Sequence, residues 1–453
     1  MKFWINKEND AEPTRDWNEA YCMSINRDSW STIYSSVPSI WYHLGKQSME
    51  YIYEDLFIIG LSIFALDKRI SRSLFDDAWT REIEVSIPVL EKNKWDRTCD
   101  KWNELLSFLT GDIWKIEFRS TSAEYGFHKN ANRSKIDISG CDCVSLFSGG
   151  LDSFCGAIKL LEDGKSPVLV GHNEYPKLRY IQENMVKDFR SNYDSQSISF
   201  LGFTAGARAP KNIEGEPLRK TENTSRGRSL LFLCAAISIA GIMGEDTPVY
   251  IPENGFIGLN ISLTNSRKGS CSTRTTHPFF LEGLSEILGE VGIHNRIENF
   301  FAYKTKREIV NLIAETQSFK NNYMNTISCS HPCVARYNRT GSREYPVNCG
   351  FCYPCLIRKA SLQDVEISEK NDVEDTISFI NTESESTKSS DLFAVLSSVH
   401  RYKGLSDKEL RRMIRGTGKL SKEKVEWFER VYREGMNDLT DFFKNEPDME
   451  KYL

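Results

Sequence analysis

The stretch SLFSGGLDSFCG at residues 145–156 joins two apolar runs through a pair of glycines. Glycine allows a sharp turn and close approach of a ligand, so a glycine pair between a buried strand and a helix presents backbone N–H groups. Those N–H groups and the helix amino terminus behind them form a concavity suited to an anion. Ser148 and Ser153 add hydroxyl donors, and Asp152 is suited to capping the helix or to reaching a magnesium ion held by phosphates. The chain contains no G-x-x-x-x-G-K-[ST] sequence, so this is not a Walker-type loop.

A second group of chemically active residues is a set of cysteines between residues 327 and 362. Three of them follow a C-x2-C-x2-C pattern, which places three thiols around one tight loop, and a fourth from a separate segment would complete a tetrahedral set. Four thiolates suit zinc and also an iron–sulfur cluster. A zinc ion with four cysteine ligands has no open position for water, so such a site would be structural. The candidate ligands are Cys349, Cys352 and Cys355, together with Cys329 or Cys333.

The elements that position these residues are predicted from the alternation of strand and helix patterns between about 139 and 320. This alternation is typical of βαβ units and of a mostly parallel sheet covered by helices. The predicted strands lie in CDCVSLF, SPVLVGH, SISFLGF and PVYIPE, and the predicted helices cover 152–163, 178–192, 227–243 and 279–291. The glycine pair therefore falls between a strand and the helix that follows it.

Residues 1–138 are predicted to form an α+β accessory or docking domain without a cluster of chemically active residues. The apolar run at 55–70 and the segment at 80–90 are interpreted as strands, and 98–112 has the apolar spacing of a helix. The central domain is expected to cover 139–362, including the cysteine segment 327–362. A polar linker at 363–390 and a helical region at 391–453 follow, with helices predicted to start at Ser406 and Ser421.

Composition limits the classes of partner. The 453 residues include 58 Lys and Arg against 63 Asp and Glu. This mildly acidic balance gives no support for a nucleic-acid partner, and no direct binding of nucleic acid is expected. The longest apolar runs are too short to span a bilayer, and the amino terminus lacks the apolar core of a signal peptide, so no membrane association is expected. The cysteines outside the 327–362 segment are scattered, as in a reduced core, and a cytoplasmic location is predicted.

The string SGGLDS resembles the SGGxDS loop of the PP-loop ATP pyrophosphatases. The resemblance implies a PP-loop (adenine nucleotide alpha hydrolase-like) fold with a doubly wound parallel sheet. It also implies that the loop holds the pyrophosphate of ATP while a substrate oxygen attacks the α-phosphorus, giving an adenylated intermediate and pyrophosphate. Catalysis would then rest on positioning and charge stabilisation. The implied ATP- and Mg²⁺-binding residues are Ser148, Gly149, Gly150, Leu151, Asp152 and Ser153, with Asp152 also catalytic.

The predicted helix start SRGRSLLF contributes two arginines, Arg226 and Arg228. Guanidinium groups bind phosphates bidentately, so both arginines are candidates for contacting the leaving pyrophosphate of ATP. The segment resembles the PGRN helix of one PP-loop branch, with Ser229 in place of its asparagine. That resemblance favours Arg228 as the catalytic arginine.

Taken in order, the SGGxDS loop, the Arg-Gly-Arg helix, AYKTKREIVNLI (302–313) and SC…CGxCxxCxxR resemble 7-cyano-7-deazaguanine synthase over about residues 139–362. The resemblance implies ATP, Mg²⁺ and structural Zn²⁺, a 7-carboxy-7-deazaguanine substrate and transfer of its adenylated carboxylate to nitrogen. It also implies a catalytic role for Lys306, matches Arg358 to the basic residue after the last cysteine, and favours Cys329 over Cys333 as the fourth zinc ligand.

Two departures from that family affect the predicted site. The substrate loop of the family, YPDCR, is replaced within NSRKGSCSTRTTHPFF (265–280), so its carboxylate is missing. The substitute substrate-binding candidates are Glu253, Asn254, Asn260, Arg274, Thr275 and His277. The added amino-terminal domain and helical tail resemble the synthase-like proteins of bacterial anti-phage islands, notably the Qat type. That resemblance implies that a deazaguanine is attached to a partner protein from the same defence operon.

Three alternatives remain beside this interpretation. The first is synthesis of free 7-cyano-7-deazaguanine (preQ0) from ammonia. The second is PP-loop tRNA thiolation with an iron–sulfur cluster, which the acidic balance and the late cysteine group disfavour. The third is a non-catalytic nucleotide-sensing scaffold, which the intact SGGLDS string disfavours because such a scaffold has no chemical need for Asp152.

Overall fold

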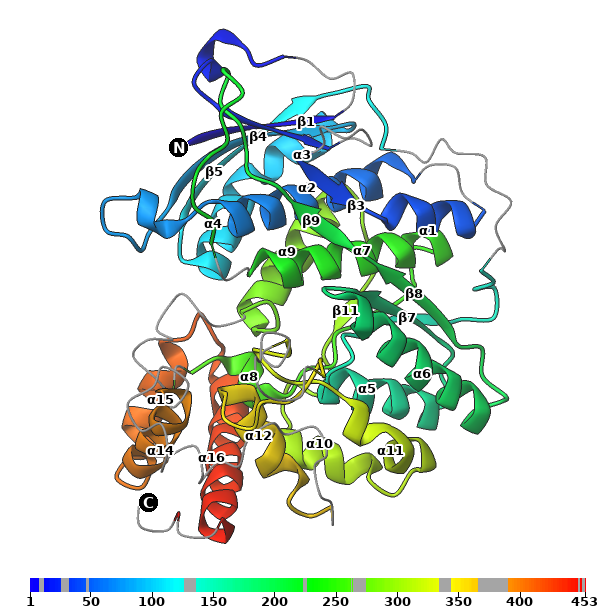
Figure 1. The fold of residues 1–453 in the computed structure, drawn as a ribbon, viewed down its shortest axis with the longest axis vertical. Helices are drawn as coiled ribbons and strands as arrows, with labels where there is room; N and C mark the ends of the chain where they lie inside the picture. Colours follow the sequence, from blue (N-terminus) through cyan, green and yellow to red (C-terminus); the bar gives the residue numbers. More distant parts are fainter. Residues whose placement is uncertain are drawn as a thin grey trace.

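The computed structural model describes residues 1–7, 12–25, 32–45, 49–125, 136–222, 226–261, 263, 274–333, 344–365, 390–446, 449 and 453. Two parallel sheets and a carboxy-terminal group of helices make up the described molecule (Figure 1). Among these residues no helix combines the length and the apolar character needed to cross a membrane. Most of the linker predicted at 363–390 and most of the substrate loop at 265–280 lie outside the described residues.

The central sheet has the strand order β11-β10-β6-β7-β8, and all its pairs are parallel. The order reverses between β6 and β10, so the carboxyl ends of these two neighbouring strands form a switch point where α/β proteins bind ligands. The strands are β6 (Cys143–Leu146), β7 (Pro167–His172), β8 (Ser199–Phe203), β10 (Val249–Tyr250) and β11 (Ile297–Glu298).

Helices cover both faces of this sheet, as a doubly wound arrangement requires. Helix α7 packs with Val144, Val168 and Val170 on one face, whereas α5 and α6 pack around Leu169 on the other. The predicted parallel sheet and its four predicted helices are confirmed, with bounds that differ by at most two residues. The helices are α5 (Leu151–Glu162), α6 (Pro176–Asn192), α7 (Gly227–Met243) and α9 (Pro278–Val291).

The amino-terminal sheet is also parallel, with the order β5-β4-β1-β2-β3-β9 and only β9 antiparallel to its neighbour. The α+β prediction for residues 1–138 is therefore wrong, because helices connect parallel strands here too. The strands are β1 (Lys2–Lys7), β2 (Tyr21–Ile25), β3 (Ile33–Ser35), β4 (Glu82–Val89), β5 (Ile113–Ser120) and β9 (Ala205–Ala207), and the α-helices before β5 are α1 (Val37–His43), α2 (Tyr51–Arg69), α3 (Lys92–Trp95) and α4 (Cys99–Thr110).

The run at 55–70, predicted as a strand, is helix α2. Every residue from Tyr53 to Asp67 is buried, so the helix is covered on all sides and shows no polar face. A short apolar stretch without such a face fits a buried strand and a buried helix equally well, and length decides between them. In contrast, the strand predicted at 80–90 and the helix predicted at 98–112 are confirmed as β4 and α4.

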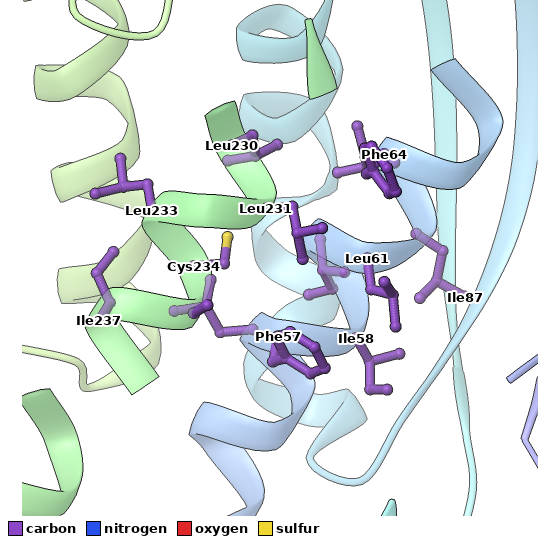
Figure 2. Packing of buried hydrophobic residues seen from close by; sticks show 14 of the residues in the cluster. Phe57, Ile58, Leu61, Phe64, Ile87, Leu230, Leu231, Leu233, Cys234 and Ile237 are labelled. Carbon is purple, nitrogen blue, oxygen red and sulfur yellow. The ribbon is translucent and has the colours of Figure 1, made fainter. Parts of the chain in front are cut away.

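The two sheets share one hydrophobic core, because α2 packs along α7 between them (Figure 2). In this view Phe57 of α2 lies toward Cys234 and Leu231 of α7. Strand β9 also comes from the central part of the chain and pairs with β3 of the amino-terminal sheet. The division at residue 138 remains a prediction, and the packing across it is continuous.

The carboxy-terminal helices pack against the cysteine segment rather than standing apart from it. A second core joins Phe256 of α8 and Cys349 and Leu356 near α12 to apolar residues of α14, α15 and α16. Ser406 caps α15 in a capping box and Ser421 caps α16, as predicted. The remaining α-helices are α8 (Gly255–Leu259), α10 (Lys306–Ile313), α11 (Gln317–Asn322), α12 (Tyr353–Leu362), α14 (Ser390–Tyr402), α15 (Asp407–Arg415) and α16 (Lys422–Asn445).

Candidate functional site

The glycine turn connects the end of β6 to the start of α5. Gly149 has a φ of 83°, in the left-handed region that glycine adopts without strain, and its carbonyl accepts a hydrogen bond from Ile327 N–H at 2.9 Å. The hydroxyl groups of Ser148 and Ser153 lie 3.1 Å apart, and Ser148 Oγ accepts from Gly150 N–H at 3.3 Å. The turn therefore presents two hydroxyls together with the first N–H groups of α5.

Asp152 lies in the first turn of α5, and its carboxylate contacts side chains of other elements instead of capping the helix. Its Oδ2 accepts from Asn254 Nδ2 at 2.9 Å and lies 3.1 Å from Lys306 Nζ. Asp152 is only 8% exposed, and its Oδ1 has no hydrogen-bond partner among the described residues. One carboxylate oxygen is thus fixed by two partners, whereas the other is buried and lies in a carboxylate that Glu253 also contacts.

Lys306 is placed by the amino terminus of α10. Thr305 and Glu308 form a capping box that fixes this end of the helix, and Lys306 is its first residue, only 4% exposed. A lysine so buried requires a partner for its charge, which Asp152 supplies. The Asp152–Lys306 pair thus joins α5 to α10 across the site.

Glu253 follows β10 and lies beside the same pair. Burial and, after it, the negative charge of Asp152 raise the pKa of Glu253 well above its ordinary value, although Lys306 acts in the opposite direction. Asn254 Nδ2 donates to Glu253 Oε1 at 3.3 Å as well as to Asp152, so Asn254 bridges the two acidic groups. Its own Oδ1 caps α8 by accepting from Ile257 N–H. Asn254 therefore orders the site rather than facing its cavity.

These groups border a cavity of about 850 Å³, a size typical of ligand sites. Its walls come from the glycine turn, the segment after β7, the start of α7, the segment after β10, the start of α10 and the residues around Cys329. It therefore lies at the carboxyl ends of β6 and β10, where the strand order reverses. The lining residues that offer charge or hydroxyl groups are Ser148, Asp152, Ser153, Glu174, Tyr175, Arg228, Glu253, Lys306, Ser328, Ser330 and His331.

The structure separates the two candidate arginines. Arg228 lines the cavity, where its guanidinium forms an ion pair with Glu174, and its side chain is 43% exposed. Arg226 is buried away from the cavity, and its guanidinium donates to the carbonyl of Thr110 at the end of α4. Of the pair, only Arg228 can meet a ligand in the cavity.

Three substrate candidates lie elsewhere. Arg274 donates to the carbonyl of Phe108 and lies over its ring, and Thr275 is completely buried. His277 caps α9 by accepting from Phe279 N–H, and burial lowers its pKa to about 3. Arg274 therefore lies against Phe108 of α4, His277 lies against Phe108 and against Thr417 just after α15, and none of the three residues lines the cavity. Asn260 ends α8 in the left-handed region and does not line the cavity either.

The four predicted cysteine ligands converge on one point. The sulfur atoms of Cys329, Cys349, Cys352 and Cys355 all lie within 4.8 Å of one another, with Cys329–Cys352 at 3.8 Å and Cys349–Cys355 at 3.9 Å. Zinc–sulfur bonds of about 2.3 Å in a tetrahedron separate the sulfurs by roughly 3.8 Å, so the donor set fits a zinc ion. Cys333 lies outside the group, which agrees with the preference for Cys329.

Sequence reasoning missed several residues that connect the cysteine segment to the glycine turn. Ser328 Oγ accepts from Leu151 N–H at 3.2 Å, and Asn348 accepts from Ser328 N–H and donates to Thr326 O. Arg358, which the family resemblance matches to the basic residue after the last cysteine, donates to Thr326 Oγ1 at 2.5 Å and is buried. The serine in the SC pair was a signal for the first contact, whereas Asn348 and Glu174 stand in no pattern that marks them.

Comparisons with known proteins show which enzymes this chain is similar to. No protein-family model matches the chain. Two curated relatives, each named 7-cyano-7-deazaguanine synthase and found in the Copenhageni and Lai serovars of Leptospira interrogans, are 29% identical to this chain over 261 residues. Each alignment covers 54% of this chain and 97% of the relative. The chain is therefore similar to this synthase over nearly the whole length of the relatives.

Proposed function

We propose that this chain is an ATP-dependent ligase with a PP-loop fold that activates a 7-deazaguanine carboxylate as an adenylate and transfers it to a nitrogen nucleophile. The observation that carries the proposal is the meeting of the glycine turn with Asp152, Lys306 and Arg228 around one cavity at the strand switch point. The 29% identity to synthases of 7-cyano-7-deazaguanine supports the substrate class. On this account the reaction releases AMP and pyrophosphate.

Different groups of this chain bind ATP and stabilise its departing pyrophosphate. The N–H groups at the start of α5 and the hydroxyls of Ser148 and Ser153 bind the β- and γ-phosphates. Lys306 and Arg228 stabilise the negative charge that develops on the departing pyrophosphate, Arg228 leaving Glu174 for this purpose. None of these groups needs to become covalently attached, so positioning and electrostatic stabilisation supply the rate enhancement.

Asp152 is suited to a magnesium ion that accompanies the nucleotide. Its Oδ1 belongs to a residue of the cavity wall and has no partner among the described residues, and carboxylate oxygen is a preferred magnesium ligand. A bound magnesium ion would supply neutralisation of phosphate charge. Asn254 and Lys306 keep the carboxylate oriented by holding Oδ2.

Of the substrate candidates, Glu253 is the one that lines the cavity. A carboxyl group at this position can bind the N–H edge of a guanine-like base, which would replace the acidic residue missing from the loop at 265–280. Binding of such an edge would favour the ionised form of Glu253, which its buried position disfavours in the free protein.

The second part of the proposal concerns the source of the nitrogen nucleophile. The relatives align with only 54% of this chain, so a large part of it has no counterpart in their alignment. Ammonia needs no docking surface, and we therefore propose an amine of a partner protein, in bacterial anti-phage defence, as the acceptor. The four cysteines are assigned to a structural zinc ion that shapes the cavity wall through Cys329.

The test is mass spectrometry of the products formed from 7-carboxy-7-deazaguanine and ATP, with ammonia or with candidate partner proteins. A partner that gains the mass of one deazaguanine acyl group, with one AMP released per conjugate, is the expected result. Two AMP per molecule of free nitrile would instead assign ordinary synthesis of 7-cyano-7-deazaguanine. No AMP with any of these substrates would overturn the proposed reaction.

A further inference from the structure

Helix α7, which carries Arg228, is capped by a residue from another part of the chain. Arg226, at its N-cap position, makes no side-chain capping hydrogen bond. Instead Asp67 Oδ2 accepts from the backbone N–H of Arg226 at 2.5 Å and of Gly227 at 2.8 Å. A carboxylate at this end satisfies two unpaired N–H donors and complements the positive end of the helix dipole.

Asp67 is itself held firmly by the amino-terminal half. It lies in the last turn of α2, is 1% exposed, and its Oδ1 accepts from Arg81 Nη2 at 2.5 Å. Arg81 also donates to the carbonyls of Asp67 and Ile70 and to the carboxylate of Asp112. Because Arg81 is completely buried and fixed by these acceptors, it leaves the capping carboxylate little freedom to turn.

The approach of α2 to α7 leaves no room for the helix start to shift. A Cβ atom placed on Gly227 would lie 2.9 Å from the Cα of Phe64, so only glycine fits there. Farther along, a Cβ on Gly60 would lie 2.8 Å from Cys234 Sγ. Figure 2 shows this stretch of the two helices, with Leu231 and Cys234 on the side of α7 that faces α2. Backbone contact and the cap thus fix α7 against α2 together.

We propose that Asp67 is a positioning residue for the ATP-cleaving site, because it fixes the start of α7 and so sets where Arg228 meets the cavity. Every lining residue of the cavity comes from position 148 or later, so the amino-terminal half acts through α7 and not by contact with the ligand. The inference rests on the proposed function in one respect: Arg228 is the group that contacts the departing pyrophosphate.

The experiment compares Asp67→Asn with Glu54→Gln. Glu54 lies on the same helix, is equally buried and is ion-paired with Lys7, but its contacts are to Lys7 and Tyr125 and not to α7. The Asp67→Asn change keeps an acceptor oxygen at this position, and Arg81 would keep Asp112, so the variant is expected to fold. Should it fail to fold in thermal unfolding, Asp67→Ser provides the second variant, because a hydroxyl is smaller than a carboxylate and still offers an acceptor oxygen.

The first measurement is carboxylate-dependent exchange of pyrophosphate into ATP, in wild-type and Arg228→Ala backgrounds. Asp67→Asn should lower exchange at least ten-fold when Arg228 is present and less than two-fold when it is absent. Glu54→Gln should change exchange less than two-fold in both. The positioning role would be overturned if Asp67→Asn and Glu54→Gln lowered pyrophosphate exchange equally. It would also be overturned if Asp67→Asn lowered exchange ten-fold in the Arg228→Ala background.

The second measurement does not depend on activity. Hydrogen exchange at the amides of Arg226 and Gly227 should become at least ten-fold faster in Asp67→Asn and stay unchanged in Glu54→Gln. Unchanged protection in Asp67→Asn would overturn the cap. If the wild-type protein shows no pyrophosphate exchange, the proposed function fails, and the protection of these two amides still decides whether Asp67 fixes α7.

Discussion

Lys306 Nζ lies 3.1 Å from Asp152 Oδ2, and this contact joins the helix after the glycine turn to the amino terminus of α10. Both residues line the cavity and both are almost fully buried. A buried cation beside a phosphate site strongly stabilises negative charge that develops nearby, because solvent screens the interaction only weakly. The pair therefore links the two sequence motifs to one chemical step.

We expect Lys306→Met to lower adenylation by about 10²- to 10³-fold, the usual effect of removing one preorganised electrostatic group. The measurement is carboxylate-dependent pyrophosphate exchange at saturating ATP. Lys159→Met is the control, because Lys159 on α5 forms an exposed ion pair with Asp163 and lies outside the cavity lining. Equal activity of Lys306→Met and the control would contradict the assignment of Lys306.

Replacing the two arginines at the start of α7 should have different effects, one on catalytic activity and the other on folding stability. Arg228→Ala should strongly reduce pyrophosphate exchange, yet change the free energy of unfolding by at most about 1 kcal/mol, since its ion pair with Glu174 is exposed. Arg226→Ala should instead lower that free energy by roughly 3 kcal/mol, because it removes a buried charged group from the contact with α4. Thermal unfolding and exchange assays on both variants check this, and the reverse pattern would contradict it.

How far the sequence predicts this site depends on how local each signal is. The glycine turn, the strand before it and the C-x2-C-x2-C run are contiguous patterns, and each lies where its local chemistry predicted. The burial of Arg226 and the exposure of Arg228 result from the packing of α7 against α2, which no spacing within SRGRSLLF reveals. Helix α2 itself was misread because its apolar run has no polar face to mark the helical period.

The substrate-binding residues are the part of the site that the sequence predicts least well. Arg274, Thr275 and His277 are polar residues near a replaced loop, so the sequence favours them as ligands. In the structure Arg274 contacts Phe108 of α4, His277 contacts Phe108 and Thr417, and Thr275 is buried outside the cavity lining. Loop residues obtain their roles from whichever distant element they meet, and Phe108 and Thr417 are distant in sequence. The resemblance to a family covers the catalytic half and says nothing of such junctions.

The cysteine group should bind about one equivalent of zinc in a colourless protein. Replacing any of Cys329, Cys349, Cys352 or Cys355 by serine should reduce bound zinc and lower the unfolding temperature, because metal binding and folding are coupled. Cys333→Ser is the matched control and should retain the metal, since Cys333 lies outside the group of sulfurs. Elemental analysis after dialysis measures this. A brown protein that contains iron would refute the zinc assignment and favour the thiolation alternative.

Glu253 should make stability depend on pH. Its pKa is raised in the folded protein, mainly by burial and then by Asp152, so the folded state keeps a proton that the unfolded chain has lost. Stability from this group is therefore full below the ordinary pKa of about 4.5 and declines as pH rises toward the raised value, by at most roughly 1.4 kcal/mol per pH unit. Glu253→Gln should remove this decline. Urea unfolding of both proteins from pH 4.5 to 8 tests it, and parallel curves would contradict the expectation.

The most direct test of the central claim is the position at which ATP is cleaved. Wild-type protein supplied with ATP, magnesium and 7-carboxy-7-deazaguanine should yield AMP and pyrophosphate in equal amounts, measured by chromatography of the nucleotides and an enzymatic pyrophosphate assay. Asp152→Ala should give neither, because its proposed role is to position metal and phosphate at the cavity wall. The variant should still show a cooperative thermal unfolding transition, at a lowered temperature because Lys306 loses its buried partner. Release of ADP and orthophosphate by the wild-type protein would contradict the assignment of the glycine turn as a pyrophosphate site.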